Sequence, residues 1–272
     1  MYLSWPVTAD VPLKGGRFFR LEAAERPGWV YEPTGPVDPE RRWVWIAPSW
    51  LATHRWLGPG NQVEPAALPP GATPIVEHQF YVEQLLARGF HVAGIDIGVS
   101  LGHPSGVAVF QAFYERVVAG WRLHPRPRLS GQSNGALMHY AWASRYPASV
   151  DRILGIYPAT DLRSWPGLAR AARGSPWLDP APYDMTPAEL EARLPEVNPI
   201  ELLAPLAQHQ VKIFHLHGDS DATVPHEPNS LELARRYRAL GGEIELDIIA
   251  GEGHTPGPKF YESRRALDFL MG

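Results

Sequence analysis

Short apolar runs alternate with helical patterns along most of this chain, and this alternation constrains its fold more than any other feature. Such alternation is typical of parallel strands joined by crossover helices. An antiparallel pair, Arg17–Leu21 and Trp29–Tyr31, is expected to come first. The expected buried strands are Trp43–Ala47, His91–Ile97, a short strand ending at Leu129 and Ser130, Ile153–Tyr157, Val211–Leu216 and Glu243–Ile249. We therefore expect residues 1–272 to form one α/β domain.

Helical patterns fill the intervals between these strands. Expected helices are Ile75–Arg88, Val107–Trp121, Asn134–Arg145, a segment with Leu233, Ala234, Tyr237 and Leu240 on one face, and Phe260–Met271. A long interval follows Ile153–Tyr157, and we interpret residues 162–205 as an inserted cap. Within it, Thr186 and Glu189 form a capping box with Pro187 at the first helical position, which predicts a helix over at least Pro187–Leu194.

Composition excludes several classes of protein. Without cysteine, the chain has no disulfide, no thiolate metal site and no cysteine nucleophile. The formal net charge of -4 comes without a block of like charges, so we expect no nucleic-acid or membrane partner. No stretch approaches the ~18 apolar residues of a membrane span. We expect a soluble protein, cytoplasmic or secreted after loss of a signal, that takes a small neutral or weakly charged substrate and uses no cofactor. Its oligomeric state is open.

A G-x-S-x-G sequence, Gly131-Gln132-Ser133-Asn134-Gly135, lies between an expected strand and an expected helix. The sharp turn at this place raises the serine oxygen above the sheet, and its glycines permit close approach of strand and helix. The motif predicts that Ser133 is a nucleophile. The alternative from the pentapeptide alone is a glycine-rich turn with an incidental serine.

A serine nucleophile needs a general base and an acid that orients that base. The strand Val211–Leu216 runs into a loop with Asp219 and Asp221, and the strand Glu243–Ile249 runs into a loop with His254. Such loops meet at the carboxyl edge of a parallel sheet, where catalytic groups collect. The order serine, acid, histidine is that of hydrolase folds.

Together these motifs resemble the α/β-hydrolase superfamily, in the region shared by prolyl-oligopeptidase-like hydrolases and acyl or carbohydrate esterases. The resemblance covers roughly residues 43–272. It implies an α/β-hydrolase fold, with a mostly parallel central sheet of about eight strands, flanking helices and a cap after the sixth strand. The family pattern of His-Gly, an Asp three residues later and Val-Pro places the acid at Asp221, with Asp219 as its rival. The Gly-x-Gly-His loop places the base at His254.

The resemblance also implies an oxyanion hole made by two backbone N–H groups. Asn134, which follows the nucleophile, supplies the first. The second comes from the loop after the first central strand, where the family usually has His-Gly and this chain has Ala47-Pro48-Ser49-Trp50. Because Pro48 has no N–H, Ser49 or Trp50 must donate, and Trp50 is preferred.

Substrate contacts are expected from residues near these loops. We interpret the loop Leu51–Pro74 as a wall of the pocket, because long loops in compact domains are usually functional or disordered. Some of the aromatic candidates are expected to anchor the cap instead of meeting substrate. The candidates for substrate contact are Trp50, Gln132, Trp165, Trp177 and Tyr183.

These observations favour a serine hydrolase that cleaves a carboxylic ester, as an acyl or carbohydrate esterase. A prolyl-oligopeptidase-like peptidase or amidase is the first alternative, and it ranks lower because the sequence lacks an accessory propeller. A second alternative is a zinc-dependent hydrolase that uses His215, His217 and Asp219, which match part of the metallo-β-lactamase-like motif. That motif normally continues with histidine, where this chain has Ser220. The third alternative is a non-catalytic binding protein on the same scaffold.

Overall fold

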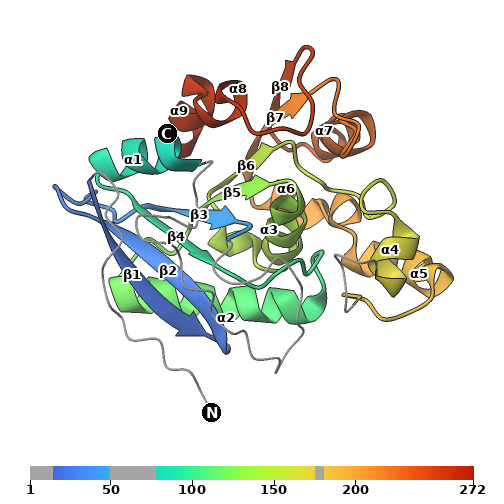
Figure 1. The fold of residues 1–272 in the computed structure, drawn as a ribbon, viewed down its shortest axis with the longest axis horizontal. Coiled ribbons are helices and arrows are strands. Elements are labelled where there is room, and N and C mark those ends of the chain that lie inside the picture. Colours follow the sequence, from blue (N-terminus) through green and yellow to red (C-terminus); the bar gives the residue numbers. More distant parts are fainter. Residues whose placement is uncertain (1–14, 50–77, 175–180) are drawn as a thin grey trace.

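A twisted eight-stranded sheet runs through the part of the chain that the structure, a computed structural model, describes: residues 15–49, 78–174 and 181–272 (Figure 1). The strand order is β1-β2-β4-β3-β5-β6-β7-β8. The strands are β1 (Gly16–Ala23), β2 (Arg26–Pro33), β3 (Trp43–Ala47), β4 (His91–Ile95), β5 (Arg128–Gln132), β6 (Arg152–Ile156), β7 (Lys212–Gly218) and β8 (Ile244–Ile249). Strand β2 pairs antiparallel with β1 and β4, and the pairs from β4 to β8 are parallel.

Helices cover both faces of this sheet (Figure 1). Side chains of α2, α3 and α7 pack on one face, and those of α1, α8 and α9 pack on the other. Strand β3 shows why its sequence is apolar throughout: Trp43 and Trp45 point into the first core, while Val44 and Ile46 point into the second. The helices are α1 (Gln79–Ala87), α2 (Pro104–Trp121), α3 (Asn134–Arg145), α4 (Leu168–Arg173), α5 (Pro187–Val197), α6 (Ala204–Gln208), α7 (Glu232–Ala239), α8 (Pro258–Tyr261) and α9 (Arg264–Met271).

The predicted strands and crossover helices are confirmed within the described residues, with ends that differ by a few residues. The first three residues of the predicted helix Ile75–Arg88 lie outside the described residues. The last helix is an exception, because the prediction of one continuous helix over Phe260–Met271 is wrong. Ser263 interrupts it with extended backbone (φ -66, ψ 117), and its side chain accepts a hydrogen bond from the Ala266 N–H. Ser263 is therefore the N-cap of α9 and separates it from α8.

The insert after the sixth strand is present and contains α4 and α5. At the start of α5, the Thr186 hydroxyl accepts from the Glu189 N–H at 3.2 Å, and the Glu189 carboxylate accepts from the Thr186 N–H at 2.7 Å. This reciprocal pair is the predicted capping box. Among the described helices, none is both long enough and apolar enough to cross a membrane.

Four buried imidazoles link stability to pH. Burial lowers the pKa of His78 and His91 to about 4, and it lowers the pKa of His139 and His215 to about 3. In the unfolded chain a histidine titrates near ~6.5, so below that pH the unfolded chain binds more protons than the folded one. We therefore expect the free energy of unfolding to be highest above about pH 6.5 and to fall progressively toward about pH 4.

Urea unfolding followed between about pH 7 and pH 5 measures this dependence before most carboxylates titrate. The His139→Phe variant removes one of the four groups and should flatten the slope. A free energy of unfolding that stays constant over this range would contradict the expectation.

Candidate active site

Ser133 lies in the turn between β5 and α3 with a positive φ of 49°. This left-handed backbone is rare for a residue other than glycine and persists only where its surroundings impose it. The Ser133 N–H donates to the Ile156 carbonyl at 3.0 Å, and the Ser133 carbonyl accepts from the N–H groups of Ala136 and Ala159, each at 3.1 Å. These bonds to β6 and to the segment after it fix the serine above the sheet edge.

The two glycines of the motif permit the close approach that this turn needs. A Cβ on Gly131 would lie 2.8 Å from the Cα of Ala136. A Cβ on Gly135 would lie 2.1 Å from the carbonyl oxygen of Ala47. Helix α3 therefore packs against the ends of β5 and β3 at distances that only glycine tolerates.

Ser133, His254 and Asp221 form a continuous set of hydrogen bonds. His254 Nε2 lies 2.9 Å from the Ser133 Oγ, and His254 Nδ1 lies 2.7 Å from the Asp221 Oδ2. Because a carboxylate only accepts, the proton of a neutral His254 is on Nδ1 and the lone pair of Nε2 faces the serine hydroxyl. The three residues follow β5, β7 and β8, so they meet at the carboxyl edge of the parallel strands.

The two candidate acids have different surroundings. Asp221 is buried, and its second oxygen accepts from the N–H groups of Thr223 and Val224 at 2.9 and 2.8 Å. Burial raises the pKa of its carboxyl, but hydrogen bonds from His217, His254 and the Val224 N–H outweigh this and hold the pKa below its usual value. Asp221 is therefore ionised at neutral pH.

Asp219 lies outside this set of contacts. Its exposed carboxylate accepts from the Ser220 hydroxyl at 2.9 Å and from the Gly251 N–H at 2.8 Å. The contact with Gly251 joins the loop after β7 to the loop after β8. The structure thus puts Asp221 against His254 and gives Asp219 a part in holding two loops together.

Comparisons with known proteins identify the fold. No protein-family model and no curated protein sequence matches this chain. Solved structures do match: dipeptidyl peptidase 4 of Porphyromonas gingivalis has a TM-score of 0.66 at 15% identity, over 96% of this chain and 36% of that one. A puromycin-hydrolyzing peptidase of Mycobacterium tuberculosis has a TM-score of 0.66 at 15% identity, over 94% of this chain and 38% of that one.

A cold-adapted esterase from an Arctic intertidal metagenomic library has a TM-score of 0.58 at 16% identity, over 98% of both chains. The chain has the α/β-hydrolase fold. It spans little more than a third of the length of the two peptidases. The predicted fold class is confirmed, including the insert after the sixth strand. Within this fold, Ser133, His254 and Asp221 form a hydrogen-bonded Ser-His-Asp arrangement.

The expected oxyanion hole is described in part. Asn134 is the first residue of α3, so its N–H has no acceptor within the helix. The close packing of Gly135 on Ala47 brings the loop after β3 next to the nucleophile turn of the α/β-hydrolase fold. In that loop, Ser49 is buried, and its hydroxyl donates to the Ile46 carbonyl at 2.9 Å. Trp50 and the predicted pocket wall Leu51–Pro74 lie outside the described residues.

Gln132 is held by neighbouring side chains beside the nucleophile. Its amide nitrogen donates to the Tyr157 hydroxyl at 3.0 Å, and its amide oxygen lies 3.3 Å from His78 Nε2. The Tyr157 hydroxyl also hydrogen bonds to that of Tyr261, and the Tyr157 ring lies 4.4 Å from the His254 ring between centroids. Sequence reasoning missed both tyrosines, although Tyr157 directly follows β6 at the edge where the α/β-hydrolase fold carries its catalytic groups.

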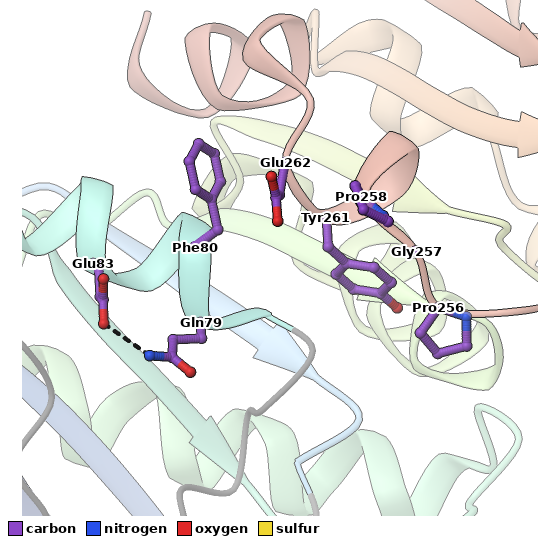
Figure 2. Close-up of a pocket in the computed structure, with 8 residues that line it drawn as sticks. All are labelled: Gln79, Phe80, Glu83, Pro256, Gly257, Pro258, Tyr261 and Glu262. Atoms are coloured by element: carbon purple, nitrogen blue, oxygen red, sulfur yellow. Dashed lines mark hydrogen bonds between the residues drawn. The ribbon is translucent and has the colours of Figure 1, made fainter.

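A cavity of about 460 Å³ lies next to the loop that carries His254. Residues from the start of α1 face residues of this loop and of α8 across it (Figure 2). Phe80 and Tyr261 supply aromatic surface, Glu83 and Glu262 supply carboxylates, and no lysine or arginine is among the described lining residues. The remaining lining residues are Gln79, Pro256, Gly257 and Pro258.

Two of the aromatic candidates for substrate contact are buried between the insert, to which they belong, and the rest of the domain. Trp165 and Tyr183 are 8% and 5% exposed, and the Tyr183 hydroxyl donates to the Leu101 carbonyl at 3.1 Å. They join insert residues to the loop after β4 and to the loop that follows Asp221, and this placement favours anchoring. Trp177 lies outside the described residues. Trp165 and Tyr183 belong to a buried hydrophobic cluster between the insert and the sheet domain. This cluster comprises Val99, Leu101, Leu137, Ala159, Leu162, Trp165, Ala171, Ala172, Tyr183, Leu190, Leu194, Val197 and Val224.

Replacing Tyr183 or Trp165 with alanine is expected to destabilise the protein by about 3 to 5 kcal/mol, because each change leaves a cavity in this cluster. The selectivity of kcat/KM among esters of different acyl size should change little if the ring only anchors the insert. Thermal unfolding and an ester series measure the two effects. Tyr183→Phe, which removes only one hydrogen bond, is the control and should cost about 1 kcal/mol. A changed ester profile with an unchanged thermal midpoint would instead establish substrate contact.

The proposed zinc ligands have other partners. The Nδ1 atoms of His215 and His217 lie 2.9 and 2.7 Å from the same Ser230 hydroxyl. Their Nε2 atoms lie 2.7 Å from the Tyr140 hydroxyl and 2.8 Å from the Val224 carbonyl, respectively. Within the described ranges, no three potential ligand residues gather in a metal-binding group. Because all four ring nitrogens are engaged, these histidines do not fit a zinc site.

Proposed function

We propose that this chain is a serine hydrolase that cleaves a carboxylic ester through an acyl-enzyme intermediate. The observation that carries the proposal is the unbroken contact from Ser133 through His254 to Asp221. The nucleophile turn and the α/β-hydrolase fold support it, because this fold presents its nucleophile in a strained turn between strand and helix.

In the proposed mechanism, the Ser133 Oγ attacks the ester carbonyl carbon while His254 Nε2 takes the hydroxyl proton. The carbonyl oxygen becomes negatively charged, and the Asn134 N–H at the start of α3 is placed to donate to it. When the tetrahedral intermediate collapses, the alcohol leaves with the proton from His254. Water then attacks the acyl-serine with His254 as base, and the acid and the free serine are released. Asp221 stays ionised throughout and stabilises the imidazolium.

An ester is proposed as the substrate, and an esterase is among the solved structures that share this fold. Peptide or amide cleavage is the second candidate, because peptidases have the higher TM-scores of 0.66. Both reactions share the acyl-enzyme and differ in the leaving group.

The cavity between α1 and α8 is the candidate pocket for one side of the ester. One of its lining residues, Pro256, is two residues after His254 in the chain. Another, Tyr261, hydrogen bonds to Tyr157, whose ring contacts that of His254. With Glu83 and Glu262 in its lining and no cation there among the described residues, it disfavours an anionic group. A neutral or cationic substituent is therefore proposed at this position.

A substrate panel tests the proposal and separates the two candidates. Purified protein is assayed with p-nitrophenyl esters of increasing acyl length, acetylated sugars and peptide amides, and a fluorophosphonate probe identifies the nucleophile. Ester hydrolysis with labelling of Ser133 supports the esterase proposal. A higher kcat/KM for peptide amides would favour the second candidate, and labelling at another residue would contradict both.

A further inference from the structure

A buried line of polar side chains lies behind the acid of the triad. The Tyr140 hydroxyl of α3 lies 2.7 Å from His215 Nε2, and His215 Nδ1 lies 2.9 Å from the Ser230 hydroxyl. The same hydroxyl lies 2.7 Å from His217 Nδ1, and His217 Nε2 lies 3.4 Å from the Asp221 Oδ2. The four side chains that lead to Asp221 are each 0% exposed: Tyr140, His215, Ser230 and His217. The line thus runs from α3 to Asp221 of the triad entirely through side chains that are shielded from solvent.

The chemistry of the partners sets the direction of these bonds. His217 Nε2 also lies 2.8 Å from the Val224 carbonyl, which can only accept, so Nε2 carries a proton. In a neutral His217, Nδ1 is then an acceptor and receives the Ser230 proton. The Ser230 oxygen in turn accepts from the His215 Nδ1–H, and His215 Nε2 accepts from Tyr140. With both imidazoles neutral, this one arrangement provides every donor with an acceptor.

The end of the line coincides with the oxygen that orients the general base. Asp221 Oδ2 faces His217 Nε2 at 3.4 Å and accepts from His254 Nδ1 at 2.7 Å. One carboxylate oxygen therefore accepts from the catalytic imidazole and also faces the N–H of a buried imidazole, which donates to the Val224 carbonyl. Among the described residues, the other titratable groups near Asp221, His254 and His217 are Tyr157, whose ring lies against His254, and His226, whose ring centroid lies 6.1 Å from that of His217.

We propose that His217 and Ser230, backed by His215 and Tyr140, are positioning residues that orient the Asp221 carboxylate toward His254. The inference rests on the proposed hydrolase function. The His217 N–H donates to the Val224 carbonyl and faces Asp221 Oδ2 at 3.4 Å, so its positive end stabilises the charge on that oxygen. This moderates the pull of the carboxylate on the His254 proton. Ser230 holds His217 in the tautomer with its proton on Nε2, because the Ser230 hydroxyl donates to the lone pair of Nδ1.

Two replacements of His217 separate positioning from packing. His217→Met keeps an apolar side chain of similar reach and removes the donor, whereas His217→Gln keeps an amide N–H for Asp221 and an oxygen for Ser230. We expect His217→Met to lower kcat by about 10- to 100-fold, as for loss of a hydrogen bond to a charged group, with little change in KM. In the His217→Met variant, the acid limb of the pH profile of kcat/KM should move to higher pH, because Asp221 then attracts the His254 proton more strongly. His217→Gln should recover most of the kcat.

His91→Met is the matched control. His91 is a buried histidine at the start of β4, at the amino ends of the parallel strands, whereas the triad lies at their carboxyl ends. Neither of its ring nitrogens has a hydrogen-bond partner among the described residues. It should keep the kcat and the pH profile of the parent. Ser230→Ala and Tyr140→Phe test the rest of the line. Both should lower kcat, and the loss should be smaller for Tyr140→Phe than for Ser230→Ala, because Tyr140 is further along the line from Asp221. These two variants also carry the test if His217→Met does not fold.

The inference is overturned if a folded His217→Met variant retains the parent kcat and pH profile, or if Met and Gln lose activity equally. Equal activity of Ser230→Ala and the parent would also overturn the role of Ser230. Nitrogen-15 NMR of the imidazoles adds a readout that needs no turnover: it should show a proton on His217 Nε2 and on His215 Nδ1. The opposite tautomers would overturn the direction of the line. Failure of Ser133 to react with fluorophosphonate in the parent protein would instead contradict the proposed function.

Discussion

Replacing Ser133 with alanine is expected to lower kcat for ester hydrolysis by about 10⁶-fold, while the protein remains folded. The reason is that His254 then has no hydroxyl to deprotonate, so attack on the ester carbonyl depends on water. The residual rate, about 10³- to 10⁴-fold over the reaction in water, would come from binding and from the oxyanion donors. Steady-state kinetics and fluorophosphonate labelling measure the loss, and circular dichroism checks the fold.

Ser144→Ala is a matched control for this change. Ser144 lies on α3, which begins directly after the nucleophile, and its buried hydroxyl donates only to the Ala141 carbonyl at 3.1 Å. The control should retain both labelling and turnover. Near-parental activity in Ser133→Ala, or labelling that persists in that variant, would refute the serine mechanism.

The second large effect is expected from Asp221→Asn, with a decrease in kcat of up to about 10⁴-fold. Oδ2 accepts from His254 and faces the His217 N–H at 3.4 Å, so an amide NH₂ at that position would meet N–H groups instead of acceptors. The proton of His254 would then move from Nδ1 to Nε2. A protonated Nε2 cannot accept the hydroxyl proton of Ser133, so the general base is lost. KM should change less than kcat, because this carboxyl is buried and acts through His254.

Asp219→Asn is the comparison that decides between the two acids. Its carboxylate accepts from the Gly251 N–H and the Ser220 hydroxyl, and an amide oxygen can accept from both. We therefore expect less than about a tenfold loss of kcat, with at most a small decrease in thermal midpoint. A loss in Asp219→Asn as large as that in Asp221→Asn would show that the assignment of the acid is wrong.

Local patterns in the sequence determined the elements of this protein. Buried strands such as Trp43–Ala47 are apolar at every position because both faces of the sheet are covered by helices. The capping box at Thr186 is a short-range signal, since it depends on contacts between residues close in the chain. The glycines around Ser133 are also readable in the sequence as a motif, although Gly135 is needed because the distant Ala47 packs against it. The α/β class and the position of the nucleophile turn follow from such signals.

Tertiary structure decided which side chains meet. Ser133 and His254 are 121 residues apart, and the order of β5, β6, β7 and β8 in the sheet brings them together. The choice of Asp221 against His254 depends on the turn that buries it while Asp219 stays exposed, two residues away on the same loop. Periodicity carries no information on such long-range pairings, because it reports only which face of an element is apolar.

The same reason explains what sequence reasoning missed. The contact of Tyr157 with His254 joins residues that follow β6 and β8, and the contact of Tyr140 with His215 joins α3 to β7. The aromatic side chains of Trp165 and Tyr183 were candidates for substrate contact by type, and only the packing of the insert shows them buried. The sequence by itself determined the elements and the reactive serine, whereas the relative placement of strands and loops determined the partners of each reactive group.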